Sequence, residues 1–391
     1  MSAERHPLPS GSGGREPSTR APAGPWSVWP EGFAETRADR DALLVLSALQ
    51  GITPRRLLAL ALIHGTASAV LEEIRRGRAG GERDRSIAER LDPVEVAARA
   101  SECGARAVWW GSPEYPAQLR HIHDPPAMLY VIGPSLPDAT SSIAIVGSRT
   151  CTDLGRELAR DLGRALALGG FTVVSGAARG IDAAAHEGAL RGGATLAVMG
   201  CGVDVVYPGG SRALIGRIRT SGTIVSEHAP GTPPLQRNFP ARNRIVAGLC
   251  RASVVVEGAS GSGSLITAEH AMEFGREVYA IPGPVTSELS TVPLQLIREG
   301  ATMIRGAEDL LEDLGLELTT LDVNRRAELT EDERRVLDRL AGPTLPDRVA
   351  VALGATVMEV VRVLMRLELR GLVRNVGGRF ERTLSRGGDG R

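Results

Sequence analysis

Residues 171–190 read FTVVSGAARGIDAAAHEGAL, and this stretch contains the pattern on which the fold depends. An apolar, β-branched run of strand length, 171–175, is followed by alanine-rich helical sequence from Ile181. Between the two lies Gly176-Ala177-Ala178-Arg179-Gly180, whose glycines let the backbone turn tightly and approach a ligand closely. The stretch therefore predicts a strand, a glycine-rich turn and a helix in succession.

The same unit recurs on both sides of this stretch. Further apolar runs of strand length alternate with helical patterns, at 143–146, 195–199, 223–226, 253–257 and 277–281. Continuous apolar strands with intervening helices are typical of a parallel sheet covered on both faces. We therefore predict an α/β fold with an extended Rossmann-like, doubly wound parallel sheet over residues 105–315, in which a ligand lies beyond the carboxyl ends of the strands.

The turns after the predicted strands are suited to phosphate. Gly147-Ser148-Arg149 follows the first strand and GASGSGS, 258–264, follows the fifth. Glycines, hydroxyls and helix N-termini all supply donors to phosphate oxygens. A dinucleotide site is not predicted, because the first turn reads GSRTCTDLG rather than GxGxxG and the second strand ends in Ser175-Gly176 where a ribose-binding acid is expected. We predict no cofactor.

The composition restricts the chemistry. The 391 residues carry a formal net charge of +0, so any polyanion site must be local. The sequence contains no lysine, which excludes a Walker A loop and Schiff-base catalysis. Every cationic contact is therefore a guanidinium, which is suited to bidentate phosphate binding and to stacking on bases.

The cysteines and the apolar runs indicate a cytoplasmic protein without a membrane segment. Cys103, Cys151, Cys201 and Cys250 form no CxxC pattern and are expected to be small core residues in a reducing compartment. No apolar run approaches a membrane span, and the N-terminus lacks an apolar signal-peptide core.

Two smaller units flank the predicted sheet domain on the N-terminal side. Residues 1–38 are rich in Pro, Gly and Ser and are predicted to be a disordered tail, although Trp26, Trp29 and Phe33 could dock on a neighbouring domain. Residues 39–100 predict a small helical module of the SAM or helix-hairpin-helix kind, broken at Gly51–Pro54 and at His64-Gly65. Such helix turns hold a DNA phosphate in some proteins and serve only for packing in others.

The C-terminal part predicts a winged helix. Residues 316–328 have linker composition, and the winged helix is expected over 329–383, followed by a disordered tail, 384–391. Thr330 with Glu333 and Thr356 with Glu359 have capping-box spacing, and a hairpin is expected to turn at Gly377-Gly378. The helix from 357 to 370 could bind DNA, contact a protein or pack against another domain.

The stretch FPARNRIVAG, 239–248, places arginines at a predicted helix start. The positive end of the helix dipole disfavours cations unless an anion lies there. Arg242 and Arg244 therefore predict an anion at this point of the molecule.

Six ordered motifs resemble one family. They are YPAQLRHIHDPPAMLYVIG (115–133), IAIVGSRTCTDLG (143–155), VVSGAARGIDAAAHEGAL (173–190), AVMGCGVDVVYP (197–208), FPARNRIVAG (239–248) and SGSLITAEHAMEFGREVYAIPG (262–283). Together, over about residues 105 to 301, they resemble DNA-processing protein A (DprA, also called Smf). The resemblance implies a non-enzymatic protein that binds and protects single-stranded DNA, forms homodimers and loads the RecA recombinase during natural transformation.

The resemblance also implies the positions of the DNA contacts. Phe239 would stack on a base or wedge beside it, and the other expected contacts are Gly147, Ser148, Arg149, Ser175, Gly176, Arg179, Gly180, Arg242, Asn243, Arg244, Ser262, Gly263, Ser264 and Thr267. The chain departs from the family pattern at SELSTVPLQLIREGA, 287–301, where Leu294 replaces an expected asparagine.

Several polar residues have structural as well as functional interpretations. Asp182 could pair with Arg179 at the helix start or be a helix cap rather than a ligand-facing group, and His186 is expected to be a hydrogen-bonded structural histidine. The alternating histidines of HIHD, 121–124, are too weak a signal for a metal, and we predict no metal site.

Two other functions remain open at this stage. Glu227 and Glu257 end strands near the expected ligand site and could support acid–base chemistry, as in a nucleotide phosphoribohydrolase. The region SGSGSLITAEH lacks the PGGxGTxxE-like order of such enzymes, however, and we predict no catalytic residue. The third possibility is a transcription regulator whose winged helix binds duplex DNA.

Overall fold

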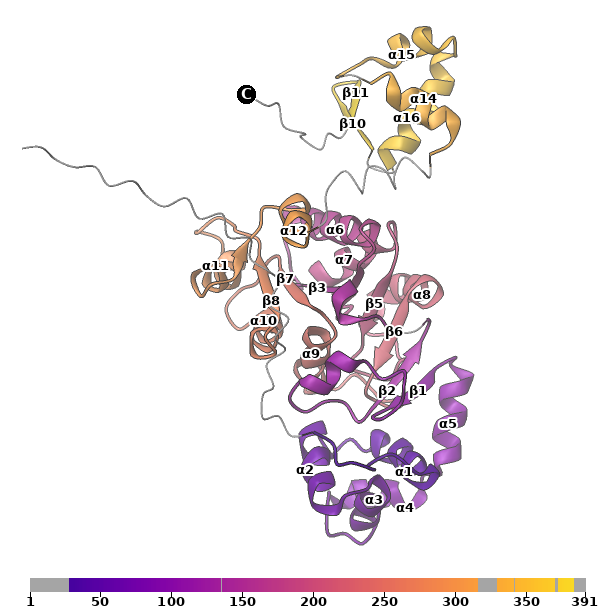
Figure 1. Ribbon diagram of the computed structural model, residues 1–391, viewed down its shortest axis with the longest axis vertical. Coiled ribbons are helices and arrows are strands. Elements are labelled where there is room, and N and C mark those ends of the chain that lie inside the picture. The colour runs from indigo at the N-terminus through magenta and orange to yellow at the C-terminus, as the bar shows by residue number, and fades with distance from the viewer. Residues whose placement is uncertain (1–27, 135, 316–328, 341, 370–371, 383–391) are drawn as a thin grey trace, which may run out of the picture.

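The computed structural model describes residues 28–382 except 135, 316–328, 341 and 370–371 (Figure 1). Residues 1–27 and 383–391, and with them most of the predicted tails, lie outside the described residues, as does the predicted linker 316–328. The described residues form a helical N-terminal module, a sheet domain and a C-terminal winged helix.

A nine-stranded sheet has the order β1-β2-β6-β5-β4-β3-β7-β8-β9. Seven of the strands are parallel: β3 (Ser142–Val146), β4 (Thr172–Ser175), β5 (Thr195–Val198), β6 (Thr223–Ser226), β7 (Ala252–Val255), β8 (Glu277–Ala280) and β9 (Thr302–Met303). The first six of these correspond to the six runs predicted from the sequence. The Rossmann-like doubly wound sheet is thereby confirmed.

Two antiparallel strands extend the sheet beyond the predicted set. β2 (Met128–Ile132) pairs with β6, and β1 (Arg106–Trp109) pairs with β2, both in antiparallel register. The sheet is therefore mixed rather than wholly parallel. β2 lies between β1 and β6 and is buried on both faces, so its continuous apolar sequence MLYVI does not reveal its direction.

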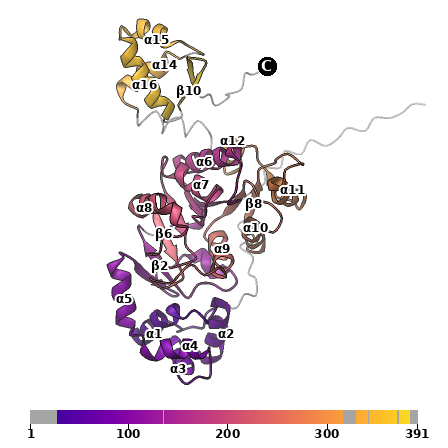
Figure 2. The ribbon, with the colours of Figure 1, turned by 180° about the vertical axis from the view of Figure 1, so that it is seen from behind.

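Alternate residues of the central strand β3 face two separate hydrophobic layers. On β3, Ile143 and Ile145 pack against α6 (Asp153–Leu168), α7 (Ile181–Ala189) and α12 (Ala307–Asp313). Ala144 and Val146 face the opposite layer, which contains η1 (Ala117–His121), α9 (Asn238–Gly248), α10 (Gly263–Glu273) and α11 (Thr291–Arg298). This alternation follows from the period of two in a strand. Helix α8 (Arg212–Ser221) lies beside α7 (Figure 2).

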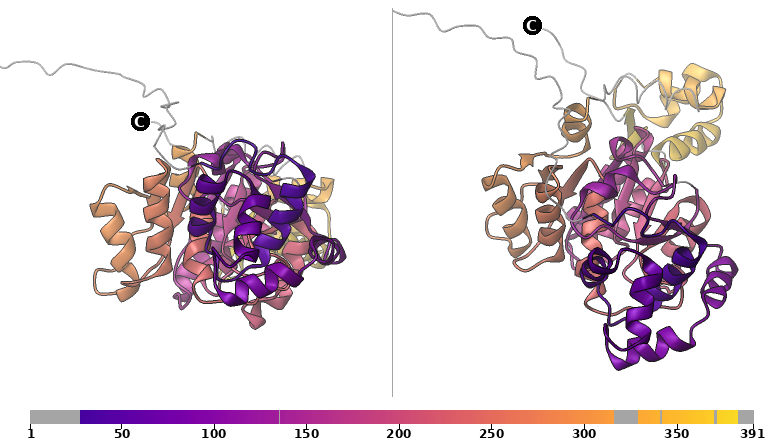
Figure 3. Two further views of the ribbon diagram at one scale, coloured as in Figure 1. Left: turned by 90° about the horizontal axis from the view of Figure 1, so that it is seen from below. Right: turned by 60° about the horizontal axis from the view of Figure 1, so that its bottom comes forward.

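The N-terminal module packs on the β1–β2 side of the sheet domain (Figure 3). Its helices are α1 (Arg37–Ala48), α2 (Pro54–His64), α3 (Ala67–Arg75), α4 (Glu82–Arg90) and α5 (Pro93–Glu102). The two predicted breaks are real, because Thr53 caps α2 with Pro54 in its first turn and Gly65 ends it at a φ of +83°.

The module begins earlier than the sequence predicts. Residues 28–36 were expected within a disordered tail, but Trp29 and Phe33 are buried and stacked on each other with ring centroids 4.6 Å apart. Trp29 Nε1 donates to the Pro125 carbonyl at 3.0 Å, so this segment docks on the sheet domain. The docking suggested for the aromatic residues is confirmed for Trp29 and Phe33, because burying two large rings offsets the entropy of ordering the chain, whereas Trp26 lies outside the described residues.

The C-terminal unit is a winged helix with a hydrophobic core of its own. It contains α14 (Glu331–Asp338), α15 (Pro346–Leu353), α16 (Val357–Leu369), β10 (Val373–Val376) and β11 (Arg379–Arg382). Both predicted capping boxes form, at Thr330 with Glu333 and at Thr356 with Glu359.

No single helix within the described ranges is long and apolar enough to cross a membrane. The helices α2 and α3 reach that length and apolarity only when they are taken together, and they are bent by 104° at the break between them.

Candidate functional site

The site lies where the strand order reverses. β3 lies between β4 and β7 in the sheet. The chain continues from β3 to β4 on one side, and from β7 to β8 on the other side, away from β3. The loops that leave β3 and β7 therefore diverge and leave a crevice at their carboxyl ends. We call this crevice the switch-point pocket, and it contains ten of the expected DNA contacts: Gly147, Ser148, Arg149, Gly176, Arg242, Asn243, Ser262, Gly263, Ser264 and Thr267.

Backbone hydrogen bonds hold three loops of this pocket together. Ser148 N donates to the Glu257 carbonyl at 2.7 Å, which joins the loops after β3 and β7. Ile181 N donates to the Ser148 carbonyl at 3.2 Å, which joins the start of α7 to the same loop. Gly180 has a φ of +79°, and a Cβ there would overlap the Ser148 carbonyl oxygen. Gly180 is therefore required for loop geometry.

Asp182 shapes the loop after β4. Its carboxylate accepts hydrogen bonds from Gly176 N at 3.2 Å and Ala178 N at 3.3 Å, so the acid fixes the loop that precedes α7. It is not the N-cap of α7, which is Gly180, and it lines the switch-point pocket. Burial raises the pKa of Asp182 above its ordinary value, although the charge of Arg242 and the backbone donors act in the opposite direction. Arg179, in the same loop, is exposed.

The N-terminus of α10 opens onto the switch-point pocket. Ser262 caps the helix by accepting from Ser264 N at 3.3 Å, and the two hydroxyls are 2.8 Å apart. Asn243 Nδ2 donates to the Gly263 carbonyl at 3.1 Å and so fixes α10 against α9. Since α10 has eleven residues, its amide ends and dipole favour an anion in the pocket.

A second pocket adjoins the first, and we call it the aromatic pocket. It is lined by Arg149, Gly176, Ala177, Ala178, Arg179, Tyr207, Pro208, Phe239 and Arg242. Phe239 and Tyr207 have ring centroids 5.1 Å apart at an interplanar angle of 35°, and the Arg149 guanidinium carbon lies 6.0 Å from the Phe239 ring centroid. The aromatic pocket therefore offers ring faces beside cationic groups.

Tyr207 is a member of this site that the sequence analysis did not single out. It is 41% exposed and stands beside Phe239. The signal was present, since Tyr207 lies within the motif AVMGCGVDVVYP of a chain with only 3% aromatic residues. Gly200 makes room for the pair, because a Cβ there would lie 2.9 Å from the Phe239 ring.

Arg242 is the floor of both pockets rather than an exposed lip. Its Nη1 donates to the carbonyls of Gly176, at 2.8 Å, and Val198, and its side chain is almost fully buried. The guanidinium thus holds the ends of β4 and β5 together. The negative partners of Arg242 include backbone carbonyls at strand ends, which the sequence pattern that predicts an anion at this point could not reveal.

Arg244 lies outside both pockets. Its guanidinium donates to both carboxylate oxygens of Glu227, at 2.9 and 2.6 Å, and its Nε donates to the Asp124 carbonyl at 2.8 Å. Burial alone would raise the pKa of Glu227, but the charge and hydrogen bonds of Arg244 outweigh it, so this pKa lies below its ordinary value. The anion opposite Arg244 is therefore a carboxylate of the same chain.

Ser175 is likewise structural. Its Oγ donates to the Ile145 carbonyl at 2.7 Å and the residue is completely buried. Of the fifteen expected DNA contacts, the two pockets contain all except Ser175, Gly180 and Arg244.

The two carboxylates considered for acid–base chemistry, Glu227 and Glu257, each bind a different partner within the chain. Glu227 pairs with Arg244, as described above. Glu257 accepts from Thr152 N at 2.9 Å and Thr152 Oγ1 at 2.6 Å, and so supports the start of α6. Neither lines the switch-point pocket or the aromatic pocket.

His186 is a structural histidine, as predicted. Thr195 Oγ1 donates to the Val173 carbonyl at 2.9 Å, so the 2.7 Å contact with His186 requires that Nδ1 of the ring donates to Thr195 Oγ1. Burial, with the nearby charge of Arg242, lowers the pKa of His186 to about 3 and keeps the ring neutral.

The segment that departs from the family pattern forms one wall of the switch-point pocket. Leu289 lines the pocket, and its carbonyl accepts from Gly258 N at 2.7 Å. Val292 N in turn donates to the Gly258 carbonyl at 2.9 Å, so this segment supports the loop after β7. Leu294 lies within α11.

Comparisons with known proteins agree with this architecture. Residues 106–315 match the family described as DNA recombination-mediator protein A, and residues 324–379 match the DprA winged helix domain. Protein Smf of Escherichia coli (strain K12) is 38% identical over 279 residues, which cover 68% of this chain and 75% of that protein.

Two solved structures are similar in fold. An X-ray structure of DNA processing protein A from Streptococcus pneumoniae has a TM-score of 0.60 and 33% identity, covering 71% of this chain and 98% of that one. DNA processing protein A from Helicobacter pylori, described for its single-stranded DNA binding mode, has a TM-score of 0.50 and 28% identity, covering 54% of this chain and 95% of that one. The chain belongs to the DNA recombination-mediator protein A family, known as DprA or Smf.

Proposed function

We propose that this protein binds single-stranded DNA across the switch-point pocket and the aromatic pocket. The observation that carries the proposal is that the two pockets adjoin and share Arg149. A nucleotide presents a phosphate and a base side by side. The amide-rich start of α10 suits the phosphate, and the Tyr207–Phe239 pair suits the base. The single-stranded DNA binding mode described for the H. pylori relative supports the same substrate.

In this proposal the cationic contacts come from exposed arginines. Arg149 and Arg179 are exposed at the pockets, whereas the buried Arg242 positions the backbone beneath them. Binding by guanidinium groups, backbone amides and ring faces does not depend on base identity, so we expect little sequence preference.

The first experiment is fluorescence anisotropy of labelled oligonucleotides over a salt series. We expect single strands to bind more tightly than duplexes. Arg149→Ala/Arg179→Ala should weaken single-strand binding and reduce the log–log salt slope by about 1.4, because each phosphate contact on a single strand contributes about 0.7. Tyr207→Ala should weaken binding by about 1–3 kcal/mol with little change in the slope, because it removes stacking rather than charge.

The matched control is Arg191→Ala/Arg217→Ala, which removes the same charge at exposed positions outside both pockets. It should leave both affinity and slope nearly unchanged. The proposed site would be overturned if the protein bound duplexes more tightly than single strands. It would also be overturned if the two double variants lost the same amount of single-strand affinity. Release of ribose 5-phosphate from nucleotides by the purified protein would favour the phosphoribohydrolase alternative, and tight binding to one duplex sequence would favour a transcription regulator.

We further propose that the bound strand is delivered to the RecA recombinase in the cytoplasm during natural transformation, without catalysis by this protein. Membership of the recombination-mediator family supports this role. The test is whether the protein accelerates RecA filament formation on single strands already covered by a single-strand-binding protein, and whether Arg149→Ala/Arg179→Ala abolishes the acceleration.

We also propose self-association at the β9 edge of the sheet. β9 is a short edge strand beside β8, and its residue Met303 is 51% exposed. Val285, in the segment after β8, and Met272, on α10, are also exposed. Exposed apolar side chains beside an unpaired sheet edge favour pairing with a second copy. Light scattering at micromolar concentration should give a dimer mass, and Met303→Asp should give a monomer.

A further inference from the structure

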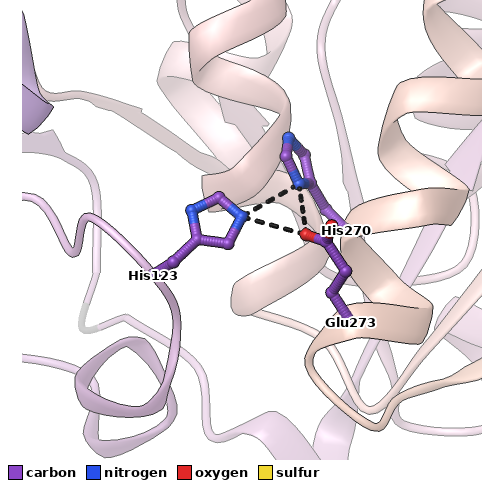
Figure 4. Close-up of side chains that lie close together, drawn as sticks. All are labelled: His123, His270 and Glu273. Carbon is purple, nitrogen blue, oxygen red and sulfur yellow. Dashed lines mark hydrogen bonds and ion pairs between the residues drawn. The ribbon is translucent and has the colours of Figure 1, made fainter. Parts of the chain in front are cut away.

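A cluster of two histidines and a glutamate lies outside both pockets. His123 comes from the segment between η1 and β2, whereas His270 and Glu273 are three residues apart on α10 (Figure 4). Residues at this spacing lie on one face of a helix. Figure 4 shows the His123 ring facing His270 and Glu273 across the gap between the two segments.

The three facing atoms form a nearly equilateral triangle. His123 Nε2 lies 3.2 Å from His270 Nδ1 and 3.1 Å from Glu273 Oε2, and His270 Nδ1 lies 3.3 Å from Glu273 Oε2. Bonds of about 2.0–2.1 Å to tetrahedral Zn²⁺ place neighbouring ligand atoms about 3.3–3.4 Å apart. The triangle therefore has nearly the size of one face of a zinc coordination tetrahedron.

Hydrogen bonds alone do not account for all three contacts. Each ring nitrogen carries at most one proton. If His123 Nε2 and His270 Nδ1 are both protonated, two donors face each other across 3.2 Å. If only one of these nitrogens is protonated, the lone pair of the other faces a lone pair of the Glu273 carboxylate. A cation at the centre interacts favourably with all three lone pairs at once.

The surroundings hold the two rings in place. The His270 ring is parallel to Phe274 within 4°, with centroids 5.8 Å apart, and the His123 ring lies 5.0 Å from both. Asp124 Oδ2 lies 3.7 Å from His123 Nδ1, on the side of the ring away from the triangle, where a carboxylate commonly supports a metal-bound imidazole. The His123 and His270 side chains are 24% and 19% exposed, which leaves a path for an ion.

We propose that His123, His270 and Glu273 form a binding site for a divalent transition-metal ion of the Zn²⁺ class. Two imidazoles and one carboxylate favour Zn²⁺ over Mg²⁺ or Ca²⁺, which prefer oxygen ligands. Three protein ligands leave the fourth position to water. The ion links the segment before β2 to α10, the helix whose other end forms the switch-point pocket.

The test uses the untagged full chain after removal of metal with a chelator. Titration calorimetry with ZnCl₂ should show about one equivalent bound, with a rise in the thermal unfolding temperature, because the ion binds the folded state. His123→Ala and Glu273→Gln should each weaken this binding by more than about 100-fold, because even loss of a residue that only supports a ligand costs 10- to 100-fold.

The matched control is His121→Ala, which removes an exposed histidine two residues away from His123. It should bind Zn²⁺ as the wild type does. Glu273 is half exposed, so Glu273→Gln without metal should unfold at the same temperature as the metal-free wild type. In addition, Co²⁺ should give the visible absorption of a tetrahedral nitrogen and oxygen site without a thiolate charge-transfer band, which separates this site from binding at Cys103 or Cys151.

Absence of saturable Zn²⁺ binding by the wild type would overturn the proposal. The same conclusion would follow if His123→Ala and Glu273→Gln retained wild-type affinity, or if the Co²⁺ spectrum showed thiolate ligation. Because none of these readouts involves DNA, the result is independent of the proposed function.

Discussion

At the scale of single residues, the arginines of the site divide by burial. Arg242 and Arg244 are buried and use their donors on carbonyls and on the carboxylate of Glu227. Arg149 and Arg179 are exposed beside the ring faces of Tyr207 and Phe239. In a chain without lysine, the guanidinium therefore serves both to fix loop backbones and to present charge to a ligand.

Arg244→Met is expected to lower the free energy of unfolding by about 3–5 kcal/mol, because it leaves the carboxylate of Glu227 buried without its partner. Since the pKa of Glu227 lies below its ordinary value, the stabilisation is present at neutral pH and is lost as the pH falls through the lowered pKa of the folded state. The difference in the free energy of unfolding between the wild type and Arg244→Met, measured by urea unfolding, should therefore be smaller in acid than at neutral pH.

The double variant Arg244→Met/Glu227→Met distinguishes the loss of the ion pair from the cost of a buried charge left without its partner. It should be more stable than Arg244→Met, because no uncompensated charge remains. Single-stranded DNA affinity of a folded Arg244→Met sample should stay close to that of the wild type. A large loss of affinity with unchanged stability would contradict the structural role of Arg244.

At the scale of elements, glycine allows α6 and α7 to approach closely. A Cβ at Gly163 of α6 would overlap the Ala185 carbonyl of α7, and a Cβ at Gly188 of α7 would overlap the Arg160 carbonyl of α6. Both obstructing groups are backbone atoms, so a side chain could be accepted only if a helix moved. This contact positions α7 and therefore the loop at its start, which includes Arg179.

Gly188→Ala is expected to lower the free energy of unfolding by about 1–3 kcal/mol, because overpacking against backbone outweighs the higher helix propensity of alanine. The control is Gly216→Ala in α8, where a Cβ has no neighbour within 4 Å. That change should stabilise the protein by about 0.5–1 kcal/mol. If the two substitutions changed the free energy of unfolding in the same direction, the close packing of α6 against α7 would not explain the effect of Gly188→Ala.

At the scale of the whole molecule, the N-terminal module and the sheet domain share a core, whereas the winged helix has its own. Leu43 and Leu46 of α1 belong to the same hydrophobic cluster as Met128 and Tyr130 of β2. Ser47 Oγ lies 2.7 Å from the Tyr130 hydroxyl, and Arg237 donates to the Gln50 carbonyl at 2.8 Å. The module is therefore part of the folding unit of the sheet.

A chain that ends at residue 315 should retain the unfolding temperature of the sheet domain and most of its affinity for single strands, because the core of the winged helix contains residues from 329 to 380 only. Removal of residues 1–102 should instead destabilise the sheet domain, because it exposes Met128 and Tyr130. Differential scanning calorimetry and anisotropy measure both effects. Loss of single-strand binding on removal of the winged helix would place the DNA elsewhere.

Local patterns were sufficient for most of the fold. The six predicted parallel strands, the breaks at Gly51–Pro54 and His64-Gly65, and the capping boxes at Thr330 and Thr356 all form as expected. Each depends on side chains within a few residues of one another, since strand periodicity, capping and turn conformation are local properties. Twelve of the fifteen expected DNA contacts lie in two adjoining pockets, while their binding of DNA stays a prediction.

By itself, the sequence determined the parallel strands, the glycine-rich turns that follow them and the helix caps. Only the tertiary structure decided that Arg244 faces Glu227, that Tyr207 stands beside Phe239, and that His123 meets His270 and Glu273. It also decided the antiparallel direction of β1 and β2. These outcomes join residues far apart in the chain, and long-range contacts depend on how complete elements pack rather than on any local pattern of residues.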